Sequence, residues 1–91
     1  MSEWRYAVVD LADNLTTITA VATLVKGVYI NAALSAHACP IKDNTTTVVT
    51  LPASASAGTH YEFDGIRFES KLIVDPDDSA TGSVMVEYNL L

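Results

Sequence analysis

Two residues of this chain, Cys39 and His37, could supply nucleophilic chemistry. They stand two positions apart, so on a strand their side chains would point to one face and could form a thiolate–imidazole pair. No Asn, Asp or Glu lies close by in the sequence to orient the imidazole. A single cysteine is also common as a small buried residue. We therefore predict no catalytic residues and expect that the chain is not an enzyme.

The only cluster of carboxylates, Asp75, Asp77 and Asp78, could bind calcium, because hard cations take oxygen ligands. An EF-hand beginning at Asp75 would need Gly at its sixth position and Glu at its twelfth, where this chain has Ala80 and Val86. A solvated turn is the favoured interpretation. One cysteine and two histidines fall short of a four-ligand zinc site. We expect no cofactor and no metal, with these three aspartates as the remaining candidates.

The composition narrows the range of partners. A net charge of −6, with five Lys plus Arg, disfavours nucleic-acid binding, which needs a basic patch. No apolar run is long enough to span a membrane. The single cysteine excludes a disulfide framework within the chain, so synthesis in a cytoplasm is expected. A hydrophobic fraction of 49% in 91 residues predicts that apolar surface is covered by homo-oligomerisation.

Hydrophobic periodicity predicts an all-β fold. Residues 66–74 alternate between apolar and charged, and the alternation returns over 82–90, on either side of an acidic turn-rich loop. We predict that these two segments form an antiparallel hairpin. Their inward positions give the predicted core: Phe68, Leu72, Val74, Val84, Val86 and Tyr88.

Further strands are predicted over 45–51, 59–63, 28–30 and 34–41, with 15–25 also favoured as a strand by its β-branched residues. Asp64-Gly65 is typical of a hairpin turn. Seven or eight short strands indicate a single antiparallel β-sandwich or jelly-roll-like domain over residues 15–91. Residues 1–14 are expected to form an N-terminal arm or edge strand, in which Trp4, Arg5 and Tyr6 are candidate interface residues.

Four stretches of the chain carry a resemblance to a known group of proteins. They are Gly27-Val28-Tyr29-Ile30-Asn31, Leu34-Ser35-Ala36-His37, Leu51-Pro52-Ala53-Ser54-Ala55, and Leu72 to Gly82. Over roughly residues 27–88 the chain resembles small virion structural proteins of tailed bacteriophages and is similar to their capsid decoration, or cement, proteins. The resemblance implies a β-sandwich or jelly-roll module, commonly a symmetric trimer, bound to the major capsid protein. It also implies a location in the virion after synthesis in the cytoplasm of a host bacterium.

The expected function is therefore that of a non-enzymatic capsid decoration protein that stabilises the shell. The alternative is a carbohydrate- or receptor-binding β module of a phage tail or fibre. In that case exposed aromatic residues, with Trp4, Tyr29 and Tyr61 as candidates, would stack on the ligand.

Overall fold

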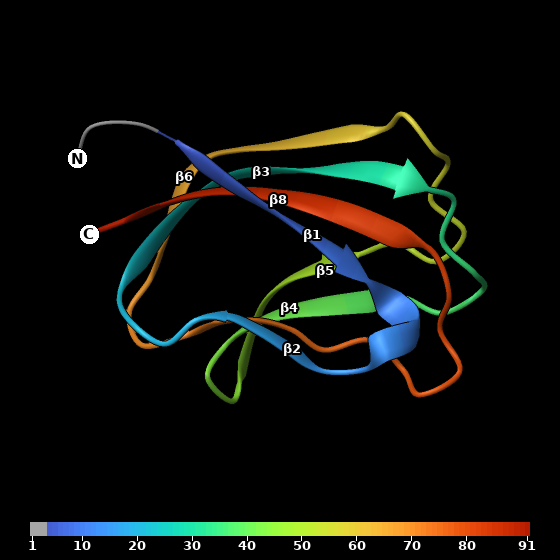
Figure 1. The fold of residues 1–91 in the computed structure, drawn as a ribbon, viewed down its shortest axis with the longest axis horizontal. Coiled ribbons are helices and arrows are strands. Elements are labelled where there is room, and N and C mark those ends of the chain that lie inside the picture. The colour runs from blue at the N-terminus through green and yellow to red at the C-terminus, as the bar shows by residue number, and fades with distance from the viewer. Residues whose placement is uncertain (1–3) are drawn as a thin grey trace.

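The computed structural model describes residues 4–91 as eight strands and one short 3₁₀ helix, with no α-helix (Figure 1). The strands are β1 (Arg5–Asp10), β2 (Thr16–Thr19), β3 (Thr23–Ala32), β4 (Cys39–Asp43), β5 (Thr46–Leu51), β6 (His60–Phe68), β7 (Leu72–Val74) and β8 (Ser83–Leu90), and η1 (Leu11–Asp13) follows β1.

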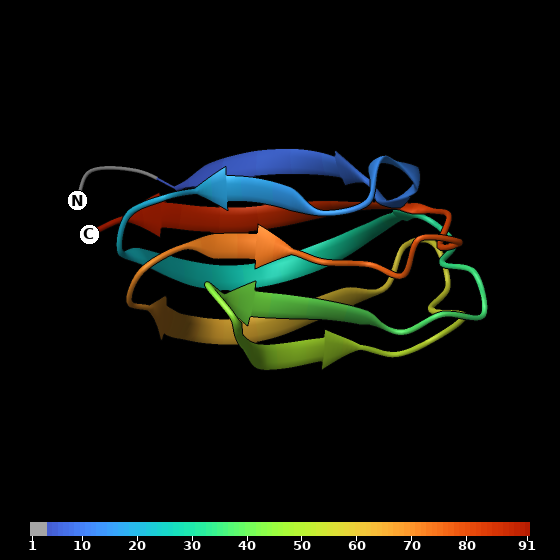
Figure 2. The same ribbon diagram turned by 90° about the horizontal axis from the view of Figure 1, so that it is seen from below.

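The strands form two four-stranded antiparallel sheets that lie face to face. We call them sheet A, in the order β1-β8-β3-β6, and sheet B, in the order β2-β7-β4-β5. Sheet B lies in front of sheet A in Figure 2, with β1 and β2 along the same side. The first strand pairs with the last, and the pairing continues inward along the chain: β1 with β8, β2 with β7, β3 with β6 and β4 with β5. A ribbon of eight strands folded in this way is a jelly roll, which confirms the predicted fold class.

The core fills the space between the two sheets. Five of the six predicted core residues are fully buried there: Phe68, Leu72, Val74, Val84 and Val86. The sixth, Tyr88, is partly buried and packs against the same cluster. These side chains meet because strand alternation gives each sheet one apolar face, and the only way to cover both faces is to stack them.

The predicted hairpin between residues 66–74 and 82–90 is wrong. The first segment is not one strand: β6 ends at Phe68 in sheet A, and β7 starts at Leu72 in sheet B. β8 then returns to sheet A, where it lies between β1 and β3. The alternation did not reveal this, because the two sheets share one core and a strand shows the same inward apolar pattern in either sheet.

Asp64-Gly65 is not a hairpin turn. Both residues have positive φ angles, 58° and 87°, but they lie inside β6, where the pairing with β3 shifts register. They form a β-bulge, which uses the same backbone conformations as a turn without reversing the chain.

Two other predicted strands are shorter or divided in the structure. The stretch 34–41 is mostly loop, because β4 begins only at Cys39. The stretch 15–25 is split at a corner that carries the chain from sheet B to sheet A. There the hydroxyls of Thr19 and Thr23 lie 2.7 Å apart, and the hydroxyl of Thr23 donates to the carbonyl of Val21 at 2.8 Å. These side-chain bonds replace the ladder bonds that a continuous strand would make.

The described part of residues 1–14 forms β1 and η1, and β1 is an edge strand of sheet A. It pairs with β8 from Arg5 opposite Tyr88 to Asp10 opposite Ser83. Residues 1–3 lie outside the described part of the chain.

Candidate functional site

Cys39 and His37 do not share a strand face. Cys39 is the first residue of β4 and is buried, whereas His37 lies in the preceding loop with its Nδ1 3.8 Å from Oδ1 of Asp77. Burial, followed by the negative charge of Asp75, raises the pKa of the Cys39 thiol to about 11. The thiol is therefore protonated at neutral pH, which is unfavourable for a nucleophile.

The acidic loop between β7 and β8 is held as a turn by its own bonds. Asp75 pairs with the ammonium of Lys42 at 2.7 Å. Oδ1 of Asp77 accepts a hydrogen bond from the Ser79 N–H at 2.8 Å, and its carbonyl accepts one from the Ala80 N–H at 2.9 Å. Within residues 4–91, no three His, Cys, Asp or Glu side chains are grouped so that they could hold a metal, and this includes Asp75, Asp77 and Asp78.

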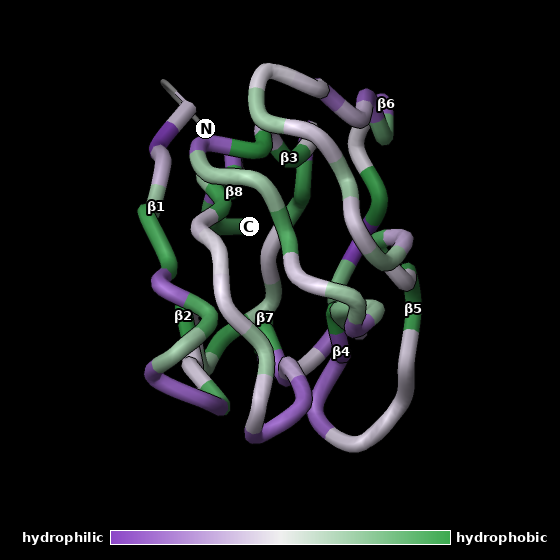
Figure 3. The backbone as a smooth tube through the Cα atoms, turned by 90° about the vertical axis from the view of Figure 1, so that its right-hand side faces the viewer, coloured by the Kyte–Doolittle hydropathy of each residue, from purple (hydrophilic) through white to green (hydrophobic). Residues whose placement is uncertain are grey.

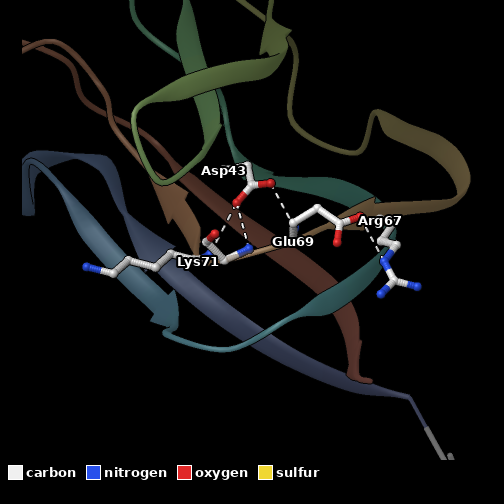
Figure 4. A network of polar contacts seen from close by, with 5 residues as sticks. Asp43, Arg67, Glu69 and Lys71 are labelled. Carbon is white, nitrogen blue, oxygen red and sulfur yellow. Dashed lines mark hydrogen bonds and ion pairs between the residues drawn. The ribbon is translucent and has the colours of Figure 1, made fainter.

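Asp43, at the end of β4, holds the corner where the chain crosses from β6 to β7. Its carboxylate accepts hydrogen bonds from the backbone N–H groups of Glu69 at 2.7 Å, Ser70 at 2.9 Å and Lys71 at 3.2 Å (Figure 4). These bonds, with that of Glu69 contributing most, hold the pKa of Asp43 below its ordinary value of 3.8. Asp43 is thus a structural clamp, and the sequence showed it only as part of a turn.

We expect Asp43→Asn to lower the melting temperature at neutral pH by about 4–8 °C, an effect similar to that of losing a helix cap. A folded-state pKa below the unfolded one means that the carboxylate stabilises the fold fully above pH 3.8 and progressively less as the pH falls through the lowered value. The difference between wild type and variant should therefore shrink in acid. Melting curves across the pH range, with Asp78→Asn in the exposed loop as control, measure this; a difference that does not change with pH would contradict it.

The outer face of sheet A carries apolar and aromatic side chains that are not part of the core. Cross-strand partners place Val8, Met85, Tyr29 and His60 side by side in one row that crosses all four strands. Residues directly opposite in a sheet point to the same face, so this row is a continuous band. Val8 is 64% exposed, Met85 and Tyr29 are half-buried, and the rings of Tyr29 and His60 lie 6.4 Å apart. We call this row, with the one beside it, the sheet-A face.

The neighbouring row of the sheet-A face is polar except at its edge. It runs from Tyr6 through Glu87 and Gly27 to Glu62. Nε2 of His60 reaches diagonally across this row to Oε1 of Glu87 at 2.7 Å. A Cβ atom on Gly27 would lie 2.6 Å from the carbonyl oxygen of Tyr61 and 3.1 Å from Nε2 of His60. Glycine at this position therefore leaves room for the contact between His60 and Glu87.

Of the three predicted interface residues, Tyr6 lies at the β1 end of this surface and Trp4 stands two positions before it, whereas Arg5, opposite Tyr88, lies on the other face of β1. Trp4 is 42% and Tyr6 71% exposed, and Arg5 is also exposed. The ammonium of Lys26 lies 5.8 Å from the centre of the Trp4 ring, a cation–π contact with β3. In Figure 3, β1 runs down one side of the molecule with a hydrophobic stretch in its middle.

Sequence reasoning missed Val8, Met85 and His60 as members of this surface. Each lies on a strand that was predicted at least in part, but their neighbours on the face come from distant parts of the chain. The alternation of Met85 away from the core was the only local signal. Nothing local shows that the strands order as β1-β8-β3-β6 and so assemble the row.

The fold and this surface define a small antiparallel jelly roll with a partly apolar outer face. No pocket opens on the part of the chain that the structure describes, nor does that part contain a helix long and apolar enough to cross a membrane. Comparisons with protein-family models, with curated proteins and with solved structures found no match to the chain.

Proposed function

We propose that this chain is a non-enzymatic virion structural protein of a tailed bacteriophage, and that it binds the assembled capsid as a decoration protein through the sheet-A face. The observation that carries the proposal is the row Val8–Met85–Tyr29–His60, which is apolar or aromatic and crosses the outer face of sheet A. An exposed surface on which an apolar row lies beside a polar one suits a large protein partner. Small-molecule sites are concave instead.

The phage assignment draws its support from the resemblance over residues 27–88 and, by analogy, from the fold. Jelly rolls occur in viral capsid domains and in lectins. Because one fold serves many functions, the fold is compatible with both a capsid protein and a carbohydrate-binding protein. The choice of a capsid partner therefore depends on the experiment below.

An assembled shell offers this domain more binding energy than a free capsid subunit does. A module that touches several subunits at once gains by effective concentration, which a single subunit in solution does not provide. A protein that binds the assembled shell and not its free subunits also stabilises the shell by mass action. The charge of −6 adds a salt-sensitive component to binding, whereas the apolar row adds one that resists salt.

We expect the purified protein to co-sediment with expanded capsids of the phage that encodes it and to leave unassembled subunits in the supernatant. The double variant Tyr29→Thr/Met85→Thr should bind about tenfold more weakly, because it removes the centre of the apolar row and keeps residues that favour strands. The matched control is Val48→Thr, which changes an apolar residue that is 38% exposed on β5 of the other sheet. Titrations sedimented at low and high salt measure both affinities.

The result that contradicts capsid decoration is failure of the folded wild-type protein to co-sediment at either salt concentration. Equal binding by the double variant would instead remove the sheet-A face from the proposal. The second candidate, a receptor- or carbohydrate-binding tail module, is favoured by the exposed aromatic side chains of Trp4 and Tyr6. Binding to host cell surfaces or glycans without binding to capsids would support it.

A further inference from the structure

The edge of sheet A formed by β1 is open, and it is less protected than the other sheet edges. Edge strands carry unpaired backbone groups, and proteins commonly shield them with bulges, charges or prolines. In the described chain the pairings of β2, β5 and β6 with their neighbours each contain a register shift. The pairing of β1 with β8 runs over six residues without one. Between Arg5 and Asp10, the strand contains no proline and no internal charge.

The free backbone groups of this edge belong to its exposed apolar residues. The Leu11 N–H, at the end of the strand, donates to the carbonyl of Gly82 at 3.0 Å. Along an antiparallel edge strand, successive residues direct their N–H and C=O groups alternately toward the neighbour and away from it. Counting back from Leu11, Tyr6 and Val8 direct theirs away from β8. Their side chains are also the two most exposed large hydrophobic ones, at 71% and 64%.

We propose that β1 pairs antiparallel with β1 of a second copy of this chain, about a two-fold axis at Ala7, so that two copies of sheet A become one eight-stranded sheet. A two-fold axis normal to the sheet keeps both outer faces on the same side, so residues that pair must both point outward or both inward. With Ala7 opposite itself, Tyr6 of each copy lies opposite Val8 of the other. This register joins the free backbone groups and covers both apolar side chains together.

The placement of charges on β1 is compatible with a second copy of this chain as the partner. Each copy carries a net charge of −6, but β1 itself is balanced, with Arg5 at one end and Asp10 at the other. In the register about Ala7, Arg5 of one copy lies opposite Val9 of the other, and Asp10 lies on the other face of the strand. The pairing therefore opposes no like charges and depends on no ion pair. The pairing is argued from the β1 edge and not from the proposed function, although Tyr6 and Val8 also belong to the sheet-A face. It predicts a dimer, in contrast to the trimer that the resemblance implies.

The first test compares two substitutions at Val8. Light scattering across a dilution series should show wild-type protein approaching twice the 9.7 kDa mass of one chain. Val8→Pro removes an N–H that faces away from β8, a position where edge strands tolerate proline, and should leave only the single-chain mass. Val8→Ala keeps the N–H and should still reach the dimer mass at the highest concentration. A wild-type monomer at all concentrations, a trimer, or a dimer of folded Val8→Pro would overturn the proposal.

The second test addresses the register. Ala7 directs its backbone groups toward its own β8, so in the dimer the two Ala7 residues would form a non-hydrogen-bonded pair. The Cα atoms of such a pair are about 4.5 Å apart, a distance that a disulfide can span. Ala7→Cys should therefore form a covalent dimer under oxidising conditions, seen on a non-reducing gel. Val48→Cys, exposed on β5, should not, and the native Cys39 is buried in both variants. Failure of Ala7→Cys to cross-link, or equal cross-linking by Val48→Cys, would overturn the pairing about Ala7.

Discussion

Phe68→Ala should lower the free energy of unfolding by about 3–5 kcal/mol, the range observed when a buried aromatic ring is removed from a core. Phe68 is the largest of the fully buried side chains and ends β6, where it pairs with Thr23 of β3. The rigid sheets on both sides limit collapse around the cavity, so the loss adds a cavity cost to the lost burial. Domains of this size are commonly stable by about 5–15 kcal/mol, so the loss is a large fraction of the total stability.

Denaturant unfolding followed by circular dichroism measures this loss. Phe63→Ala is the matched control, because Phe63 lies on the same strand and is only partly buried against the core. Phe63→Ala should lower the free energy of unfolding clearly less than Phe68→Ala does. Equal losses for the two variants would show that burial of Phe68 does not dominate the stability of this sheet.

Gly82→Ala should destabilise the fold by about 2–4 kcal/mol, through backbone strain and a steric clash together. Gly82 has a φ of +113°, which a residue with a Cβ rarely adopts. A Cβ at this position would lie 2.7 Å from the carbonyl oxygen of Ala33 and 2.9 Å from Cδ2 of Leu34. The carbonyl of Gly82 also accepts the bond from Leu11, so movement to relieve the clash would disturb the start of β8 and the end of β1.

The control that separates the two causes is Gly65→Ala. Gly65 also has a positive φ, +87°, but a Cβ there would meet nothing within 4 Å. It should therefore show the conformational cost alone. If Gly82→Ala costs no more than Gly65→Ala in denaturant unfolding, the close approach to Ala33 and Leu34 has no energetic weight.

The candidate interaction surface could be predicted only in part. The segment from Trp4 to Tyr6 stood out because its two aromatic residues fall on one face of a strand, where they could dock on a neighbouring subunit. Tyr29 was noted only as an isolated aromatic residue. Its neighbours on the sheet-A face, Val8 and Met85, come from the first and last strands. Bringing them together depends on the long-range pairing of β8 with both β1 and β3, which no local pattern encodes.

The amino-acid sequence by itself determined that the chain is all-β and which side chains near its C-terminal end enter the core. Strand alternation is a local property, so Phe68, Leu72, Val74, Val84 and Val86 could be assigned inward without knowing their partners. Turn-forming residues are also a local signal, and they marked most of the places where one strand ends and the next begins. Only the tertiary structure decided which sheet each strand joins, because both sheets share one core and impose the same alternation. It also decided the open edge at β1 and the clamp at Asp43, since these depend on contacts between residues far apart in the chain.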